Sequence, residues 1–322
     1  MLRRSLPALL ILTAILFYFS LFTTLANVFE IISIDAVSII ALVISSDVFV
    51  DEARSLSSRF RISSSSMGKF ILGTGAVLDE IAVVLDSSLR GFGGISFGTI
   101  EGSNILTLAI LIILIPLFVT GVSRKQTVGA MLVLVASAIV LPLAFLPVHY
   151  TLIFAPFLIL IFLLYVLTGN SQHTPAENEK IQRFSIPVMA LSVLLLALSS
   201  NALVIYTDRI SAISGISSFA SGFIVTGIAG SLPEITMFIT SIRKVDGQAA
   251  MGVVIGSTIY KGTFLLAISM LITRIYFHTG LQAMLFMLPA SFMLIFLSSV
   301  RSRKYYSFIL GALMIISAFL LY

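Results

Sequence analysis

A carboxylate lies beside a proline in the middle of an apolar stretch, where residues 230–234 read Gly-Ser-Leu-Pro-Glu. Burying a charge in hydrocarbon is costly, so an acid such as Glu234 within a membrane segment marks a functional site. Pro233 has no N–H and breaks the helix ladder, which frees backbone carbonyl groups. A carboxylate beside free carbonyl oxygens suits a hard cation such as calcium or sodium. These residues predict a cation site that includes Gly230, Ser231 and Glu234.

The same pattern occurs a second time, 154 residues earlier. Glu80 aligns with Glu234, and Gly102-Ser103 aligns with Gly256-Ser257. Apolar matches are common by chance in this composition, whereas Glu, Gly and Ser matched at one fixed offset are not. The chain therefore contains two copies of one unit, and the duplicated acid favours ion binding over a structural Glu bonded to the backbone. Further matched pairs are Ser63 with Ser217, Gly68 with Gly222, Gly73 with Gly227, Ser87 with Ser241, and Gly98 with Gly252.

Small residues recur every four positions in each copy, as at Gly98 and Gly102. Residues four apart share one helix face, and small side chains let helices approach closely in lipid. We expect this face to pack against the helices that carry the two glutamates. Ser103 and Ser257 would then supply hydroxyl oxygens to the same cation, although helix packing alone also explains a serine there.

The composition indicates an integral membrane protein. Of 322 residues, 58% are hydrophobic and 10% are charged, whereas soluble domains carry about 25% charged residues. The chain has no cysteine, which excludes disulfides, thiol catalysis and zinc thiolate sites. The net charge of +5 is divided among short loops, so no nucleic-acid partner is expected. The three histidines do not cluster, which argues against a histidine metal site.

Apolar segments of about 20 residues can each cross the bilayer as a helix. Eleven such spans are predicted: 6–28, 31–50, 66–88, 94–120, 127–147, 150–168, 185–207, 216–241, 248–273, 280–299 and 304–321. With the N-terminus in the cytoplasm, 15 Lys and Arg residues fall on the cytoplasmic side and 3 on the other. This bias predicts a multi-pass protein of the cell membrane with its C-terminus outside.

The polar stretch 169–183 is predicted to be a cytoplasmic linker. It divides the part of the chain that follows the first helix into two halves. Residues 1–28 form a retained helix or a signal-like segment, because their apolar run is longer than a usual signal core. Residues 29–168 and 184–322 then hold five helices each. Since five is odd, the second half enters the membrane from the opposite side, as in inverted-repeat transporters. The fold class is therefore all-α, with two inverted five-helix repeats and an extra N-terminal helix.

The second-half motif, residues 230–234 followed by Gly256-Ser257-Thr258-Ile259, resembles the alpha repeat of the sodium/calcium exchanger superfamily. The first half shows a weaker version around Glu80 and Gly102-Ser103-Asn104-Ile105. The resemblance implies a ten-helix antiporter core. It also implies that Glu80 and Glu234 bind the transported ion together with nearby carbonyl and hydroxyl oxygens.

Several positions depart from the family pattern. Asp79 replaces the proline of the first repeat, and Ala76 replaces a small polar residue. The family's Asn or Asp on the second helix is Thr107 in one repeat and Lys261 in the other, and Glu101 is an added acid. Asp79 and Glu101 are candidates to line the ion path, with a solvated or packing role as the alternative for each.

Lys261 lies within a span, where a lysine must pair, lose its proton or reach water. The repeat places it facing Glu80 and Glu234. We expect its ammonium to occupy the place of one bound cation. Such a built-in charge favours a lysine–carboxylate proton switch, or a smaller ion stoichiometry, over three-sodium exchange. The alternative is a lysine that extends to the membrane interface.

The sequence as a whole predicts a secondary antiporter, not an enzyme, that exchanges calcium for protons or sodium. Its cation ligands would come from Ala76, Glu80, Ser103, Thr107, Gly230, Ser231, Glu234 and Ser257, with Asp79, Glu101 and Lys261 in coupling or charge replacement. No cofactor is expected, and the partners are inorganic cations and the lipid bilayer. The oligomeric state stays open, and a monomer suffices.

Three alternatives remain. The first is a transport-inactive or regulatory protein of the same fold, because Lys261 and Thr107 change the family's ion shell. The second is an antiporter of a monovalent cation against protons. The third is an intramembrane acid hydrolase that uses Asp79, which the repeat argues against. No P-loop is present, so an ion gradient is the only energy source that the sequence indicates.

Overall fold

The computed structural model describes residues 7, 9–16, 28–59, 77–118, 124–167, 184–244 and 247–299. This part of the chain is built of helices joined by short turns and contains no strand. The all-α prediction is confirmed for these residues. Seven of their helices are long and apolar enough to cross a membrane: Phe29–Glu52, Gly93–Leu114, Gln126–Phe145, Val148–Leu167, Ile186–Ser214, Met251–Ile272 and Phe277–Ile295.

The full count of eleven spans stays a prediction. The predicted spans 6–28, 66–88 and 304–321 fall wholly or partly outside the described residues. The predicted span 216–241 corresponds to one continuous helical run. That run consists of α10 (Ser218–Ser221), the π-helical segment η3 (Gly222–Thr226) and α11 (Gly227–Lys244).

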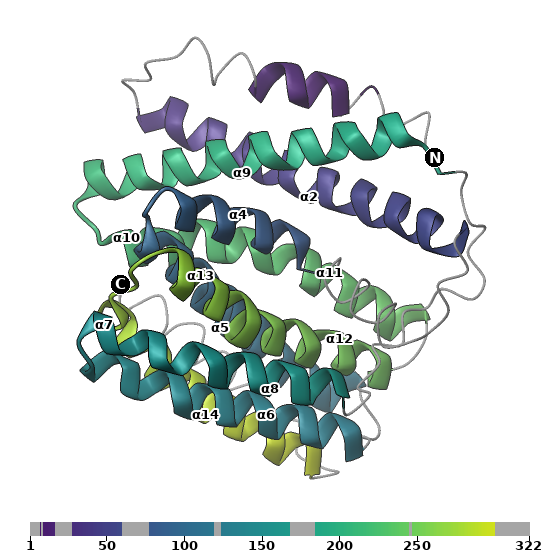
Figure 1. Ribbon diagram of the computed structural model, residues 1–322. Coiled ribbons are helices and arrows are strands. Elements are labelled where there is room, and N and C mark those ends of the chain that lie inside the picture. Colours follow the sequence, from purple (N-terminus) through teal and green to yellow (C-terminus); the bar gives the residue numbers. More distant parts are fainter. Residues whose placement is uncertain are drawn as a thin grey trace.

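Two long helices form one layer of the molecule, α2 (Val28–Arg59) and α9 (Ile186–Ser214) (Figure 1). They run antiparallel, because Glu52 near the end of α2 accepts a 2.7 Å hydrogen bond from the backbone N–H of Ser185, just before α9. Ile31 and Ile34 pack with Tyr206 in one apolar cluster, which Leu9 and Leu16 also join. The N-terminal segment therefore lies against this layer.

The central layer carries the candidate site (Figure 1). Its elements from the first half are α4 (Leu78–Leu89) and α5 (Gly93–Phe118). From the second half come α10, η3 and α11, followed by α12 (Gly247–Ile259), the π-helical segment η4 (Tyr260–Leu265) and α13 (Leu266–Ile272). π-Helical turns within α-helices occur often at functional sites, and here both precede or contain candidate residues.

The third layer lies on the other side of the central one (Figure 1). It comprises α6 (Arg124–Val140), η1 (Leu141–Phe145), α7 (Val148–Thr151), η2 (Leu152–Phe154), α8 (Ala155–Leu167), η5 (Phe277–Gly280) and α14 (Leu281–Ser299). In this layer α14 packs on both α6 and α5. Ser137 of α6 and Ser291 of α14, which are 154 residues apart, lie within hydrogen-bond distance at 3.2 Å.

The glycines of α5 allow direct backbone contact with the second half. A Cβ atom on Gly98 would lie 2.2 Å from the carbonyl oxygen of Phe219, and one on Gly102 would lie 2.5 Å from that of Phe223. No larger residue fits without moving backbone. The close approach expected for this face therefore occurs, against the segment that continues into α11 and Glu234.

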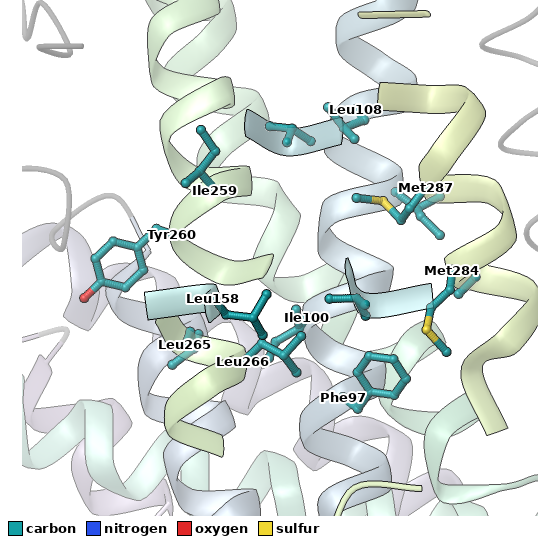
Figure 2. Packing of buried hydrophobic residues seen from close by; sticks show 14 of the residues in the cluster. Phe97, Ile100, Leu108, Leu158, Ile259, Tyr260, Leu265, Leu266, Met284 and Met287 are labelled. Atoms are coloured by element: carbon teal, nitrogen blue, oxygen red, sulfur yellow. The ribbon is translucent and has the colours of Figure 1, made fainter. Parts of the chain in front are cut away.

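Apolar side chains fill the space between the central and third layers (Figure 2). The ring of Phe97 meets those of Phe219 and Phe277, with centroids 5.2 Å and 4.9 Å apart. Met284 and Met287 extend from α14 toward α5 (Figure 2). This packing fixes the rotation of α5 about its own axis, and so decides which of its residues face the glutamates.

Candidate functional site

The ammonium of Lys261 lies between the two glutamates. Its Nζ atom is 2.7 Å from Oε2 of Glu234 and 3.3 Å from Oε1 of Glu80. It also donates a hydrogen bond to Oγ of Ser103. The side chains of Lys261, Glu80 and Glu234 have no exposed surface. The three charges form a closed cluster inside the protein.

Three separate elements bring these side chains together. Glu80 lies in the first turn of α4, which begins directly after Val77, and Glu234 follows Pro233 inside α11. Because proline has no N–H, a carbonyl one turn earlier in α11 loses its usual helical donor. Lys261 projects from the π-helical segment η4, where the wider turn displaces side chains from a regular helical register.

Two hydroxyl groups of α5 complete the hydrogen bonding of the cluster. Ser103 donates to Oε1 of Glu80 at 3.0 Å, and Thr107 donates to Oε2 of Glu234 at 2.7 Å. The two residues are four positions apart and therefore share one helix face. Thr107 belongs to the first half of the sequence, and the glutamate to which it donates belongs to the second half.

Each carboxylate keeps one oxygen that is not engaged. Oε2 of Glu80, Oε1 of Glu234 and Oδ2 of Asp79 are buried, and no hydrogen-bond partner for them occurs among the described residues. A buried polar oxygen without a partner is costly, so these atoms are available to a cation or a proton. Asp79 is itself only 1% exposed, which places a third acid beside the cluster.

Gly230 has a role that its type alone does not indicate. A Cβ atom at this position would lie 2.6 Å from Cγ of Glu80 and 3.1 Å from its Cδ. Because Gly230 has no side chain, the side chain of Glu80 can lie directly against the backbone of α11.

The remaining predicted ligands are near the cluster or outside the described part. Ser231 and Ser257 are buried, and each donates its hydroxyl proton to its own helix, to Ile228 O at 2.7 Å and to Val254 O at 3.0 Å. Their oxygen lone pairs remain available. Ala76 lies outside the described residues.

Glu101 is not at the cluster. It lines a separate cavity together with Asn104 and Thr258. Thr258 was not among the predicted site residues, but it belongs to the second-half motif and stands 154 residues after Asn104, so the repeat could have indicated that the two lie near each other.

The electrostatics of the cluster make its three charges interdependent. Removing one member of a buried ion pair leaves an unpaired charge and costs about 3–5 kcal/mol. Two carboxylates and one ammonium leave a net charge of −1 before Asp79 is counted. Within the described residues, no group of three His, Cys, Asp or Glu side chains is arranged to hold a metal ion.

Comparison with known proteins supports a transport role. The family model for sodium/calcium exchanger proteins matches twice, over residues 30–168 and 184–322. The inner membrane protein YrbG of Escherichia coli (strain K12) is 26% identical over 74% of this chain and 78% of its own length. The putative antiporter CaxA of Alkalimonas amylolytica is also 26% identical, over 70% of this chain and 75% of its own.

Solved exchanger structures share the fold. The Ca²⁺/H⁺ antiporter protein YfkE superposes with a TM-score of 0.73 at 17% identity, over 98% of this chain and 99% of its own. The H⁺/Ca²⁺ exchanger CAX gives a TM-score of 0.65 at 16% identity, over 98% and 93%. The sodium-calcium exchanger NCX_Mj gives 0.59 at 21% identity, over 91% and 99%. The two family matches cover most of the sequence, and the chain therefore belongs to the sodium/calcium exchanger family and is a multi-pass membrane transporter, not an enzyme.

Proposed function

We propose that this protein is a secondary antiporter that exchanges calcium for protons or sodium around Glu80 and Glu234. The observation that carries the proposal is the position of the Lys261 ammonium, within 3.3 Å of one carboxylate and 2.7 Å of the other. A cation already sits where two buried acids converge. A transported cation that reaches the same oxygens has a binding site only when Lys261 withdraws.

Competition between Lys261 and the ion gives the site its working cycle. When the ion enters, it takes Oε2 of Glu234 from the ammonium and also gains the unengaged oxygens of both glutamates. When the ion leaves, Lys261 returns and offsets one of the two carboxylate charges. The ion-free protein then carries less uncompensated charge through the membrane than two bare carboxylates would. We infer a smaller ion stoichiometry than three-sodium exchange, because the Lys261 ammonium occupies one cation position in the ion-free state.

The proposal includes two inverted five-helix repeats, eleven spans, a cytoplasmic N-terminus and an external C-terminus. Support for the repeats comes from the two family matches, which begin at residues 30 and 184, and from the antiparallel course of α2 and α9. We place the alternation of access at the apolar boundary between this helix pair and the central layer. Leu42 of α2 and Leu203 of α9 meet Val83 of α4 there, and such a surface can slide without breaking hydrogen bonds.

The test is flux of radioactive calcium into proteoliposomes that hold the purified protein, with a sodium or a proton gradient imposed in turn. We expect uptake that depends on at least one gradient and that Glu80→Gln or Glu234→Gln abolishes. Asp86→Asn is the matched control, since this α4 carboxylate only forms an exposed 2.9 Å ion pair with Arg90. It should leave the flux unchanged.

Absence of flux for every cation under every gradient would contradict the proposal and leave a transport-inactive protein of this fold. Proton-coupled flux of sodium or potassium without calcium would identify the monovalent antiporter instead.

A further inference from the structure

A second polar cavity lies on a different face of α5 from the glutamate cluster. It has a volume of about 20 Å³ and is lined by residues of α5, α12, η4, α6 and α14. A cavity of this size holds a single water-sized guest. Its polar lining comes from Glu101, Asn104, Thr258 and Ser137, and its apolar lining includes Met284 and Met287, which extend toward α5 (Figure 2).

Four polar atoms of this cavity have no partner among the described residues. Oε2 of Glu101, Oδ1 and Nδ2 of Asn104, and Oγ1 of Thr258 are all buried without a hydrogen-bond partner among the described residues. The three residues are 4%, 0% and 2% exposed. Four unsatisfied atoms around one small cavity are unusual, because nearly all buried polar groups are paired in proteins. A small polar guest in the cavity would satisfy them.

The carboxylate of Glu101 also lacks a counter-charge. The salt bridges of Lys261 go to Glu80 and Glu234, and none to Glu101 occurs in the described part of the chain. Glu101 and Asn104 are three positions apart and share a helix face. Among the described residues, the side-chain hydrogen bonds to Glu80 and Glu234 come from Ser103, Thr107 and Lys261, and none comes from Glu101 or Asn104.

We propose that this cavity is a binding site for one monovalent metal cation, with sodium as the ion that it takes. Glu101, Asn104 and Thr258 offer carboxylate, amide and hydroxyl oxygens, which are the ligands that hard cations prefer. A single positive charge balances the single carboxylate. A divalent ion would leave an excess charge among Val133, Ala136 and Val140, which is costly in apolar surroundings.

The halves of the sequence contribute unequally to this site. Asn104 and Thr258 are 154 residues apart, as are Ser137 and Ser291 on the neighbouring helices. The acid has no such counterpart, because Ile255 stands where a second Glu101 would be. The cavity consequently takes one ion and not two. This site goes beyond the proposed exchange centre and does not depend on it.

The test is equilibrium binding of radioactive ²²Na⁺ to the purified protein in detergent, with choline chloride holding the ionic strength constant. We expect Glu101→Gln to lower the number of bound sodium ions per chain by one. Thr258→Val removes one ligand and keeps the shape, so it should raise the Kd of that ion several-fold. Thr207→Val removes another buried hydroxyl without a partner, away from the cavity, and should leave binding unchanged.

A second variant separates this site from the glutamate cluster. Glu80→Gln, Lys261→Met and Glu234→Gln together remove all three charges, so no unpaired charge is left behind. The triple variant should still bind one sodium ion, and adding Glu101→Gln should abolish that binding. The proposal is overturned if Glu101→Gln leaves the sodium count unchanged or if the wild type binds no sodium. Failure of calcium flux in liposomes would not alter either result.

Discussion

Thr107 of α5 donates a 2.7 Å hydrogen bond to Glu234 of α11, although the two residues belong to opposite halves of the sequence. We expect Thr107→Val, which keeps the shape and removes the donor, to weaken cation binding at the cluster. Hydrogen bonds to charged groups contribute about 1.5–3 kcal/mol, so the KM for the transported cation should rise by about tenfold or more. Flux measured over a range of cation concentrations checks this. Thr279→Val removes an exposed hydroxyl that bonds only to Tyr276 O, and it should leave the KM unchanged.

Removal of the Lys261 ammonium should both destabilise the protein and change its ion dependence. Lys261→Ala leaves two buried carboxylates without their cation, which costs about 3–5 kcal/mol in the free energy of unfolding. Thermal unfolding in detergent measures the first effect, and flux against imposed ion and pH gradients measures the second. Combining it with Glu234→Gln should restore part of the stability. Unchanged ion selectivity together with an unchanged pH profile would refute the role of Lys261 as a built-in cation.

Gly230→Ala should disturb the opposite glutamate. The new Cβ would lie 2.6 Å from Cγ of Glu80, so the Glu80 side chain must move away from Lys261. Overpacking of this kind costs about 1–3 kcal/mol, and flux should fall more than stability does. Gly252→Ala is the comparison, since a Cβ there meets no described atom within 4 Å. Equal flux in the two variants would show that Glu80 does not need this space.

Gly102→Ala should weaken the contact between the halves. Its Cβ would lie 2.5 Å from the carbonyl oxygen of Phe223, a backbone atom that cannot step aside as a flexible side chain can. We expect a loss of about 1–3 kcal/mol in the free energy of unfolding, seen as a lower Tm. A Tm equal to that of the wild type would mean that α5 and η3 tolerate a wider spacing than the structure shows.

The acids and the membrane segments were readable from sequence because both depend on local composition. The offset that aligns Glu80 with Glu234 also equates Thr107 with Lys261, which led to the expectation that Lys261 faces both glutamates. The structure brings these residues together. The sequence also indicated that Gly98 and Gly102 allow a close helix contact.

Other features could not be predicted from the sequence. The 154-residue offset shows which positions of the two halves correspond, but it does not show which residues of one half pack against the other half. The order of residues in the chain does not show that Thr107 donates a hydrogen bond to the glutamate of the other half. It also does not show that Gly230 leaves space for the side chain of Glu80. The sequence places Glu101 with the coupling residues, whereas its side chain lines a separate cavity. Its direction depends on the rotation of α5 about its axis, which Phe97 and the methionines of α14 set by packing.

The contact of Gly98 and Gly102 with η3 makes each half of this chain incomplete on its own. A fragment ending before the 169–183 linker would expose a bare glycine face, and one beginning after it would hold a buried lysine without Glu80. The two halves therefore behave as obligate partners that happen to share one polypeptide. A gene split at the linker should give a working protein only when both fragments are made in the same membrane.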